Sequence, residues 1–434
     1  MILIFSHITS PRLQYICHFI FKELMGVDFT IMIDSEEFKN YDGIKINYSN
    51  SKIENVGFNI QNHSLLFEND IKEQAIERFT INNYKAFFSM EKSDLPFDIF
   101  AASFYLLSRY EEYLPHEKDM YGRYAHENSL AFKENFLHLP LINIWVKEFA
   151  EVIRKKYSIF NIQYSIFNFL PTYDIDIAYS FKHKGLLRNI GGFLRSPSLE
   201  RIKVLLGAKK DPFDTYECLD ALHEKYSLQP LYFFLVAEKN APPIAIGYDK
   251  NISPHKEAMW QLVKQHAKKY TIGLHPSWQS GNNVSLLKKE KEQLEAMAGQ
   301  TGINKSRQHY IRFNLPGGYQ RLAEAGITDD YSMGYGSING FRASVTSSFF
   351  WYDLEKEEQT ALRIHPFCFM EANSFYEQKY SAQEAYEEMT HYYEQCKAVN
   401  GTLITIWHNN FLGSDKIFTG WREAYERFIA QVQQ

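Results

Sequence analysis

Apolar and polar positions along the first part of the chain predict a small α/β unit. Residues 1–6 (MILIFS) form an apolar run of strand length, residues 11–25 carry apolar side chains at helical spacing, and residues 29–33 form a second apolar run. This order predicts an opening β-α-β unit. Residues 41–72 alternate weakly and predict short antiparallel strands. Two apolar helices are expected further on, at 97–110 and 140–157.

From residue 169 onward, strand-length apolar runs alternate regularly with helical patterns. Strands are expected at 169–174, 229–236, 271–274, 309–313 and 402–407. Helices are expected at 212–226, 254–270, 286–301, 319–325, 381–399 and 420–432. Such alternation predicts parallel strands joined by helices, and its length favours a closed barrel. We therefore expect an α/β protein of two domains: a smaller α/β domain at 1–165 and a distorted (β/α) barrel at 166–434.

Composition narrows the function classes. The 434 residues carry 47 Lys and Arg against 52 Asp and Glu, a net charge of −5, which argues against a main role in binding nucleic acid or coating an anionic membrane. The four cysteines form no C-x-x-C pair, which suits a reducing compartment. The first residues lack the features of a secretory signal, and no apolar run reaches 18 residues. A cytoplasmic protein without a transmembrane segment is expected.

Titratable residues border several of the expected strands. The strand at 169–174 ends in Asp174 and Asp176, the strand at 271–274 is followed by His275, and His408 ends the last strand. Arg307, His309 and Tyr310 lie in a fourth such region, and Asp249 follows the strand at 229–236 as a weaker candidate. Because sites in parallel α/β folds form at the carboxyl ends of strands, these residues could converge.

The two aspartates suggest a metal. Asp174 and Asp176 lie two residues apart. Two carboxylates at such a short distance repel each other unless a cation lies between them. Aspartate and histidine are common zinc ligands, and three protein ligands plus water make a hydrolytic site. The second carboxylate would then be free to act as a base. Each motif alone also has a structural interpretation, such as a helix start for D-x-D or a packed histidine for His408.

The run PTYDID at residues 171–176 is similar to the first motif of polysaccharide deacetylases (carbohydrate esterase family 4), which reads T-F-D-D or T-F-D-V-D. The resemblance implies that Asp174 is the catalytic base and Asp176 a metal ligand. The segment His275–Gln279 resembles the second motif, H-[ST]-x-x-H, with Gln279 in place of the second metal histidine. The run Ile406-Trp407-His408 resembles the last motif, L-x-H, which implies that His408 is the general acid.

The third motif of that family, R-x-P-Y, resembles residues 307–310. The resemblance implies that Arg307 orients the base and that the backbone N–H of Tyr310 helps to bind an oxyanion. His309 replaces the proline and is our candidate for the missing metal ligand, ahead of Gln279. The fourth motif is not clear, and its place could be taken by residues 340–342, which include Arg342, or by residues 364–366.

The resemblance covers residues 166–434 and is closest to a divergent branch associated with bacterial surface polysaccharides, in which an extra α/β domain precedes the barrel. Residues 108–113 and the pair Gly122-Arg123 resemble that extra domain. It implies a divalent metal, with zinc favoured, and a saccharide substrate that loses an N-acetyl or O-acyl group. Trp278, Trp407 and Arg342 are the expected substrate-binding residues.

Two other functions stay open at this point. A non-catalytic or weakly catalytic saccharide-binding protein of polysaccharide assembly is suggested by Gln279, because the usual second histidine is lost. A glycosidase is weaker, because a pair of carboxylates two residues apart on one strand is a poor source of two opposed groups. The oligomeric state is not indicated by the sequence.

Overall fold

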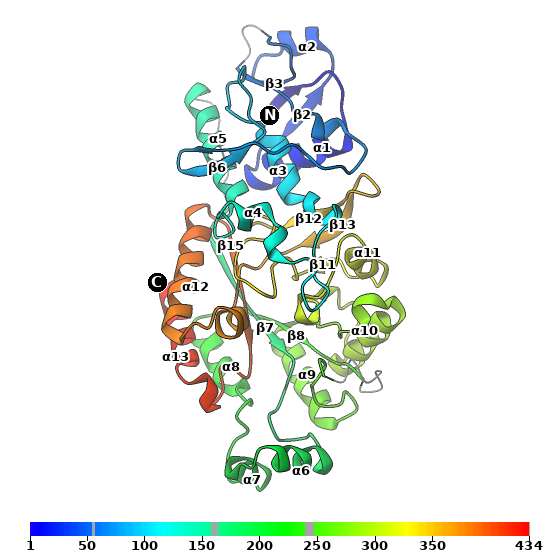
Figure 1. Cartoon of the computed structure of the whole chain (residues 1–434), viewed down its shortest axis with the longest axis vertical. Coiled ribbons are helices and arrows are strands. Elements are labelled where there is room, and N and C mark those ends of the chain that lie inside the picture. The colour runs from blue at the N-terminus through cyan, green and yellow to red at the C-terminus, as the bar shows by residue number, and fades with distance from the viewer. Residues whose placement is uncertain (54–56, 158–161, 163–164, 239–246, 434) are drawn as a thin grey trace.

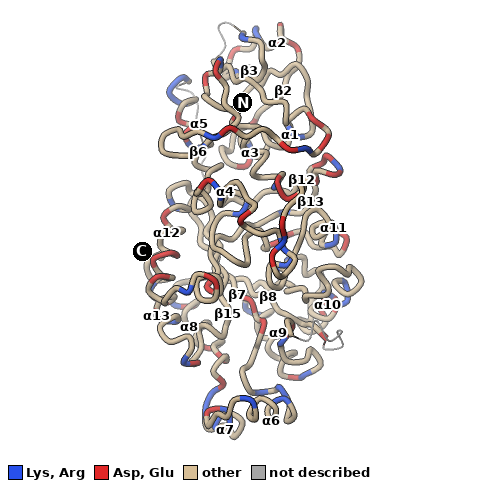
Figure 2. The backbone as a smooth tube through the Cα atoms, in the orientation of Figure 1, with Lys and Arg blue, Asp and Glu red and all other residues tan. Residues whose placement is uncertain are grey.

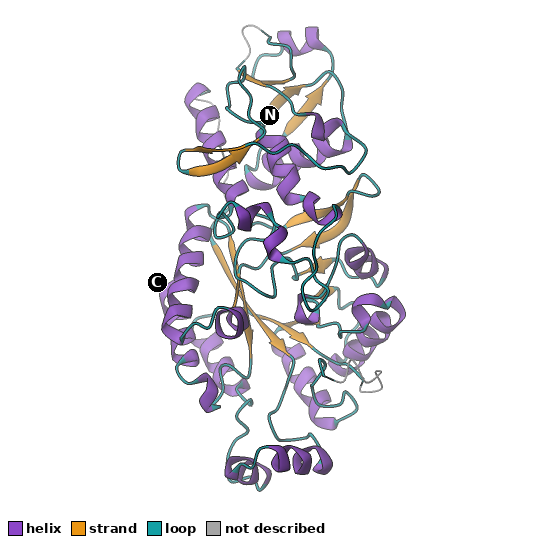
Figure 3. Cartoon of the chain, viewed as in Figure 1, coloured by secondary structure: helices purple, strands orange, loops and turns teal. Residues whose placement is uncertain are grey.

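The computed structural model describes residues 1–53, 57–157, 162, 165–238 and 247–433. The molecule is elongated, and Figure 1 shows three levels along its long axis. The N-terminal residues lie at one end, a large sheet with its helices forms the middle, and the short helices α6 and α7 form the other end. Figure 3 shows the small and the large sheet as separate groups of strands.

The N-terminal sheet is parallel throughout. It contains β1 (Ile2–Phe5), β2 (Phe29–Met32), β3 (Ile44–Tyr48) and β4 (Phe58–Ile60), in the order β2-β1-β3-β4. The antiparallel strands predicted at 41–72 are therefore wrong. β3 has four buried residues among its five, so it lacks the alternation that marks a strand with one face in solvent.

The predicted helices of this region are present. α3 (Ile99–Leu107) begins after Asp98, whose buried carboxylate accepts hydrogen bonds from the N–H groups of Phe100 and Ala101. The other elements are α1 (Pro11–Cys17), which continues as a π-helix to Leu24, α2 (Ser35–Asn40), the hairpin β5 (Arg78–Ile81) and β6 (Tyr84–Phe87), α4 (Leu130–Lys133) and α5 (Leu141–Lys156).

Among the described residues, the large sheet contains nine strands. They are β7 (Asn168–Ile175), β8 (Leu231–Phe234), β9 (Thr271–Leu274), β10 (Lys305–Ser306), β11 (Asp329–Asp330), β12 (Phe349–Asp353), β13 (Glu358–Ile364), β14 (Phe369–Met370) and β15 (Thr402–His408). Their order is β12-β13-β11-β10-β9-β8-β7-β15-β14, and all pairs are parallel except β12 with β13. The alternating pattern therefore predicted a parallel sheet correctly.

A closed barrel is not observed. Among the described residues no ladder joins β14 to β12 or β13, so the sheet is open there. β10, β11 and β14 have two residues each, which is too short for long ladders, and β12 turns back antiparallel on β13. The sheet nevertheless curls strongly. Arg307, next to β10, reaches Thr172 Oγ1 on β7 at 2.7 Å although two strands lie between, a span of about 14 Å in a flat sheet.

Helices connect and cover these strands. They are α8 (Tyr216–Lys225), α9 (Glu257–Lys269), α10 (Val284–Ala298), α11 (Gly317–Glu324), α12 (Ala382–Ala398) and α13 (Trp421–Val432). The strand predicted at 309–313 is wrong: residues His309–Ile311 form a 3-10 turn in which Tyr310 and Ile311 have φ of 59° and 53°. This left-handed backbone cannot continue a strand. Two further helices, α6 (Leu186–Arg195) and α7 (Leu199–Leu205), were not predicted.

The N-terminal unit packs closely on the large sheet. Arg12 pairs with Glu357, and Arg342 donates to Glu112 at 2.8 and 2.6 Å. One hydrophobic cluster runs through both units. The division near residue 165 stays a prediction, and residues 158–161 and 163–164 beside it lie outside the described residues. Among the described helices, none has the length and apolarity needed to cross a bilayer.

Candidate metal centre

A cavity of about 460 Å³ opens at the carboxyl ends of the large sheet. Residues that follow β7, β9, β10 and β15 line it, which is the position where parallel α/β folds place their sites. Ten residues were expected from the sequence to form the site. Six of them line the cavity: Asp174, Asp176, His275, His309, Tyr310 and His408.

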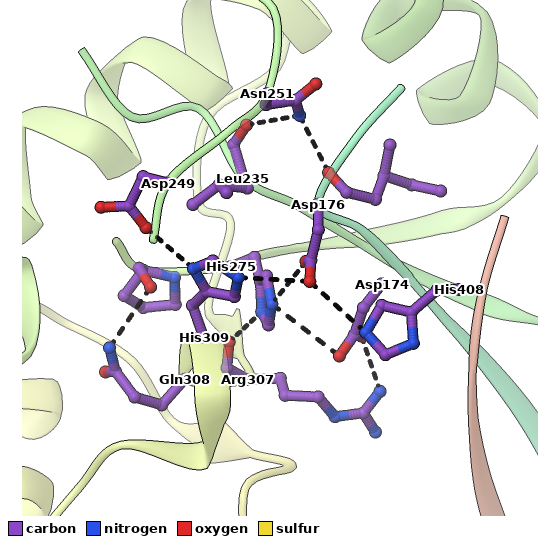
Figure 4. Close-up of polar contacts among 12 residues, drawn as sticks. Asp174, Asp176, Leu235, Asp249, Asn251, His275, Arg307, Gln308, His309 and His408 are labelled. Atoms are coloured by element: carbon purple, nitrogen blue, oxygen red, sulfur yellow. Dashed lines mark hydrogen bonds and ion pairs between the residues drawn. The ribbon is translucent and has the colours of Figure 1, made fainter. Parts of the chain in front are cut away.

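Asp176 is the centre of a three-residue cluster (Figure 4). Its Oδ1 atom lies 3.0 Å from Nε2 of His275, and its Oδ2 atom lies 3.2 Å from Nε2 of His309. One ligand atom from each of the three side chains lies within 4.8 Å of the others. Both histidines are buried, and Asp176 is partly exposed toward the cavity. The three side chains expected as metal ligands therefore lie together, and the choice of His309 over Gln279 as a ligand stays a prediction.

The other ring nitrogens of the two histidines are held from behind. Nδ1–H of His275 donates to the backbone carbonyl of Arg307, and Nδ1 of His309 lies 2.8 Å from Oδ1 of Asp249. Asp249 is itself positioned by the backbone N–H of Trp278 at 3.2 Å. Such partners fix the ring orientation and leave Nε2 free, as is usual for histidines that bind metals.

The cluster fits a divalent cation. The carbonyl of Arg307 can only accept, so Nδ1 of His275 carries a hydrogen, and whenever the ring is neutral its Nε2 lone pair faces Oδ1 of Asp176, 3.0 Å away. That Oδ1 atom is buried and has no hydrogen-bond donor among the described residues. Two lone pairs facing each other at this distance repel, and a cation between them removes the repulsion. One carboxylate and two imidazoles are a donor set that suits zinc.

Electrostatics agree with this arrangement. Burial alone would raise the pKa of Asp176, but His309, His275 and His408 hold it well below its ordinary value. Burial would lower the pKa of His309, but Asp176 and Asp249 raise it to about 9. The cluster therefore stabilises positive charge strongly at this point.

Asp174 lies beside the cluster and is buried. Its Oδ1 atom accepts a hydrogen bond from Nη1 of Arg307 at 2.9 Å, and its Oδ2 atom lies 3.8 Å from Nε2 of His275. Arg307 is held in turn by Thr172 Oγ1 and by the carbonyl of Tyr331, at 2.7 and 3.0 Å. The carboxylate thus has one oxygen fixed by a guanidinium and the other directed to the cluster.

His408 approaches the same aspartate from the end of β15. Its Nε2 atom lies 3.4 Å from Oδ2 of Asp176, and its Nδ1 atom lies 2.6 Å from Oε1 of buried Glu371. The backbone N–H of His408 also donates to this Glu371 oxygen. Burial opposes the charged imidazolium, but Glu371 and Asp176 raise the pKa of His408 well above its ordinary value. These contacts therefore favour the protonated form of the His408 ring.

Tyr310 forms part of the cavity wall and is held by the N-terminal unit. Nη1 of Arg123 donates to the Tyr310 carbonyl at 2.7 Å, and Nε of Arg123 pairs with Asp119 at 2.6 Å. Tyr121 also lines the cavity, with its ring centroid 5.4 Å from that of Tyr310. Residues from the N-terminal part of the chain therefore complete the cavity wall.

The expected substrate-binding residues lie elsewhere. Trp407 is completely buried against Tyr425 and Trp421, so its expected role at a sugar ring is wrong. The same holds for Arg342, which is buried in an ion pair with Glu112. Trp278 is not among the cavity-lining residues, because Tyr248 stacks on its ring at 4.0 Å.

The positions of Glu371, Tyr121 and Arg123 at this site were not predicted from the sequence. Glu371 follows the two-residue strand β14, which has no recognisable pattern, and Tyr121 and Arg123 come from a distant part of the chain. Only Gly122-Arg123 carried a signal, through its resemblance to an N-terminal domain, and that signal did not indicate a position. Asp249 was a weak candidate, and the structure places it against His309.

Comparisons with known proteins are limited. Residues 2–158 match a family of unknown function (DUF7033), a region that ends before β7 and the metal cluster. No curated protein matches the chain. One similar solved structure, described as a "putative polysaccharide deacetylase" from Mycobacterium smegmatis, is 15% identical and covers 62% of this chain and 84% of that chain, with a TM-score of 0.39. This similarity assigns neither a family nor an activity.

Proposed function

We propose that the protein is a metal-dependent hydrolase that removes an acetyl or other small acyl group from a saccharide. One observation carries the proposal. A cluster that fits a cation, a carboxylate held by a guanidinium and an imidazole held by a carboxylate all face one cavity. The sequence resemblance of these segments to polysaccharide deacetylase motifs supports the acyl group and the saccharide as the substrate class.

Asp176, His275 and His309 would hold the ion. A divalent metal in such a site acts as a Lewis acid on a carbonyl oxygen and lowers the pKa of a water molecule. Asp249 and the Arg307 carbonyl keep the two imidazoles turned toward that position. A non-catalytic protein was considered because Gln279 replaces the second metal histidine of the resembled family. His309 would supply that ligand instead.

Asp174 would accept the proton of the attacking water. Its Oδ2 atom faces the cluster, and Arg307 keeps the carboxyl group in place through Oδ1. The water oxygen bonds to the acyl carbon, and the bond from that carbon to the sugar nitrogen or oxygen then breaks. A positioned general base of this kind contributes about 10²–10⁴-fold in rate.

His408 would protonate the departing amine or hydroxyl of the sugar. It lies on the other side of Asp176 from His309, and Glu371 orients its ring. Asp174 and His408 are register partners on the neighbouring strands β7 and β15, and both side chains border the cluster (Figure 4). A cavity of about 460 Å³ is large enough for one or two sugar units and is in the usual range for small-molecule sites.

The test is acyl release with metal content measured on the same samples. Zinc-loaded protein is incubated with N-acetylated and O-acetylated sugars and short oligosaccharides, and free acetate is quantified. We expect release that is lost in Asp176→Ala together with bound zinc. Zinc bound in stoichiometric amount without acyl release from any of these substrates would contradict the proposed activity while leaving the metal site intact.

A further inference from the structure

The helices α6 and α7 form a small unit that extends away from the rest of the molecule. Figure 1 shows them at the end of the long axis opposite the N-terminal sheet. They follow one another closely, since α6 ends at Arg195 and α7 begins at Leu199. We call residues 182–210 the helical hairpin.

The hairpin exposes large apolar side chains. Five leucines on the two helices or directly after them are 75–87% exposed: Leu186, Leu187, Leu194, Leu199 and Leu206. The three on α6 are spaced i, i+1 and i+8, so they lie on one face of that helix, and the other two lie at the first residue of α7 and directly after its last. Exposed leucines at this density mark an interaction surface, because single exposed apolar residues are ordinary but groups of them are not.

The hairpin is also strongly basic. It contains eight Lys and Arg and one acidic residue, Glu200, a net charge of +7 in a chain whose net charge is −5. Figure 2 shows the blue segments gathered on α6, α7 and the chain beside them. The whole-chain charge, which argued against an anionic membrane, therefore hides a local cluster of the opposite sign.

The hairpin is joined to the rest of the molecule by a hydrogen-bonded neck, which consists of residues 180–182 and Asp211. The buried carboxylate of Asp211 accepts hydrogen bonds from the backbone N–H groups of Ser180, Phe181 and Lys182 at 2.7, 2.8 and 2.9 Å. Arg188 of α6 donates to the backbone carbonyl of Lys250 at 2.6 Å, and Lys250 lines the cavity. The exposed leucines are thus presented by a fixed element.

We propose that the helical hairpin docks on the surface of an anionic lipid bilayer, with its leucines in the interface and its basic residues against the lipid headgroups. Short amphipathic helices with an apolar face and Lys and Arg around it bind in this way. The hairpin projects from one end of the molecule, so it can reach a flat surface without obstruction by the N-terminal unit. A second copy of this face is a poor partner, because two clusters of +7 repel.

The hairpin and the candidate metal centre share one strand. β7 carries Asp174, and the chain continues through Asp176 into the neck of the hairpin. Both therefore leave the sheet at its carboxyl edge. Docking through α6 and α7 would hold this edge of the molecule toward the lipid surface.

The test uses the full chain in vesicle flotation. Vesicles of phosphatidylcholine with phosphatidylglycerol are compared with vesicles of phosphatidylcholine alone, at low and high salt. We expect binding to the anionic vesicles that weakens as salt rises. Arg195→Gln with Lys203→Gln should weaken binding about 25-fold, at about fivefold for each charge near an anionic surface. Leu187→Ser, Leu194→Ser and Leu206→Ser together should weaken it by about 100-fold or more.

A matched control separates a specific face from general stickiness. Ile33, Ile166 and Ile417 are also exposed, and their triple replacement by serine should leave vesicle binding unchanged. Equal flotation of the wild-type chain with neutral and anionic vesicles, or none with either, would overturn the proposal. So would a leucine variant that keeps vesicle binding but loses self-association in sedimentation velocity, because the face would then join protein chains.

Discussion

Nη1 of Arg307 lies 2.9 Å from Oδ1 of Asp174, and both side chains are buried. The same arginine accepts a hydrogen bond from His275 at its backbone carbonyl. One residue therefore orients the proposed base through its side chain and a proposed metal ligand through its main chain. This coupling ties Asp174 on β7 to His275, which follows β9.

Asp174→Asn should separate the role of the proposed base from the binding of the metal. The amide has the size of the carboxylate and cannot accept a proton, and Asp174 is not one of the three clustered ligands. We expect acyl release to fall by about 10²–10⁴-fold while bound zinc is retained. Acetate release and zinc content are measured on the same preparation. A variant that keeps most of its activity would show that another group takes the proton.

The third metal ligand can be tested by a pair of variants. His309→Ala removes an imidazole whose Nε2 lies 3.2 Å from Asp176, whereas Gln279→Ala removes the residue at the position where the resembled family has its second histidine. Calorimetric zinc titration should show a loss larger than about 100-fold for His309→Ala and no change for Gln279→Ala. Asp249→Asn, which changes only the partner behind His309, should lose about 10–100-fold. The opposite ranking of His309 and Gln279 would make Gln279 the ligand.

The sequence predicted much of this site because its residues end apolar strands. Asp174, Asp176, His275 and His408 could be found from strand ends and motif spacing, and the structure places all four at one cavity. Glu371 could not, because it follows a strand of two residues and acts only through contact with His408. A partner that is defined by contact across the sheet leaves no local pattern.

The errors have similar causes. Trp407 is the middle residue of the motif that ends in His408. Because side chains alternate along a strand, the Trp407 side chain lies on the opposite face of β15 from His408 and is buried. The 3-10 turn at 309–311 looked like a strand because its residues are apolar or aromatic, and only the backbone shows the left-handed φ. The open sheet could not be foreseen, because helix and strand alternation does not determine whether the last strands meet.

The contact between the two units predicts a pH-dependent stability. Burial would raise the pKa of Glu112, but Arg342 and Arg109 lower it to about 2 from its ordinary 4.5. A depressed pKa means that the carboxylate stabilises the folded chain above pH 4.5 and that this contribution is lost as the pH falls toward 2. The shift corresponds to about 3 kcal/mol.

Urea unfolding of wild type and Glu112→Gln checks this contribution. At neutral pH the variant should be less stable by about 3–5 kcal/mol, because buried Arg342 loses its carboxylate and buried Arg109 keeps only Glu111. The difference between the two proteins should shrink as the pH falls below 4.5, since the wild-type carboxyl group then takes up a proton. A difference that does not change with pH would mean that Glu112 acts through packing and not through its charge.

The last prediction concerns Arg123, which reaches the site from the N-terminal unit. It donates to the Tyr310 carbonyl at 2.7 Å, beside a backbone N–H that the resemblance implies as an oxyanion donor. Arg123→Ala should free this left-handed turn and lower kcat, by less than the roughly 10²–10³-fold that removal of an oxyanion donor costs, with zinc affinity unchanged. Tyr310→Phe is the matched control, because it keeps the backbone and removes only the hydroxyl, so its kcat should stay close to wild type. If Tyr310→Phe loses activity and Arg123→Ala does not, the phenol matters and the N-terminal unit does not position the backbone for the reaction.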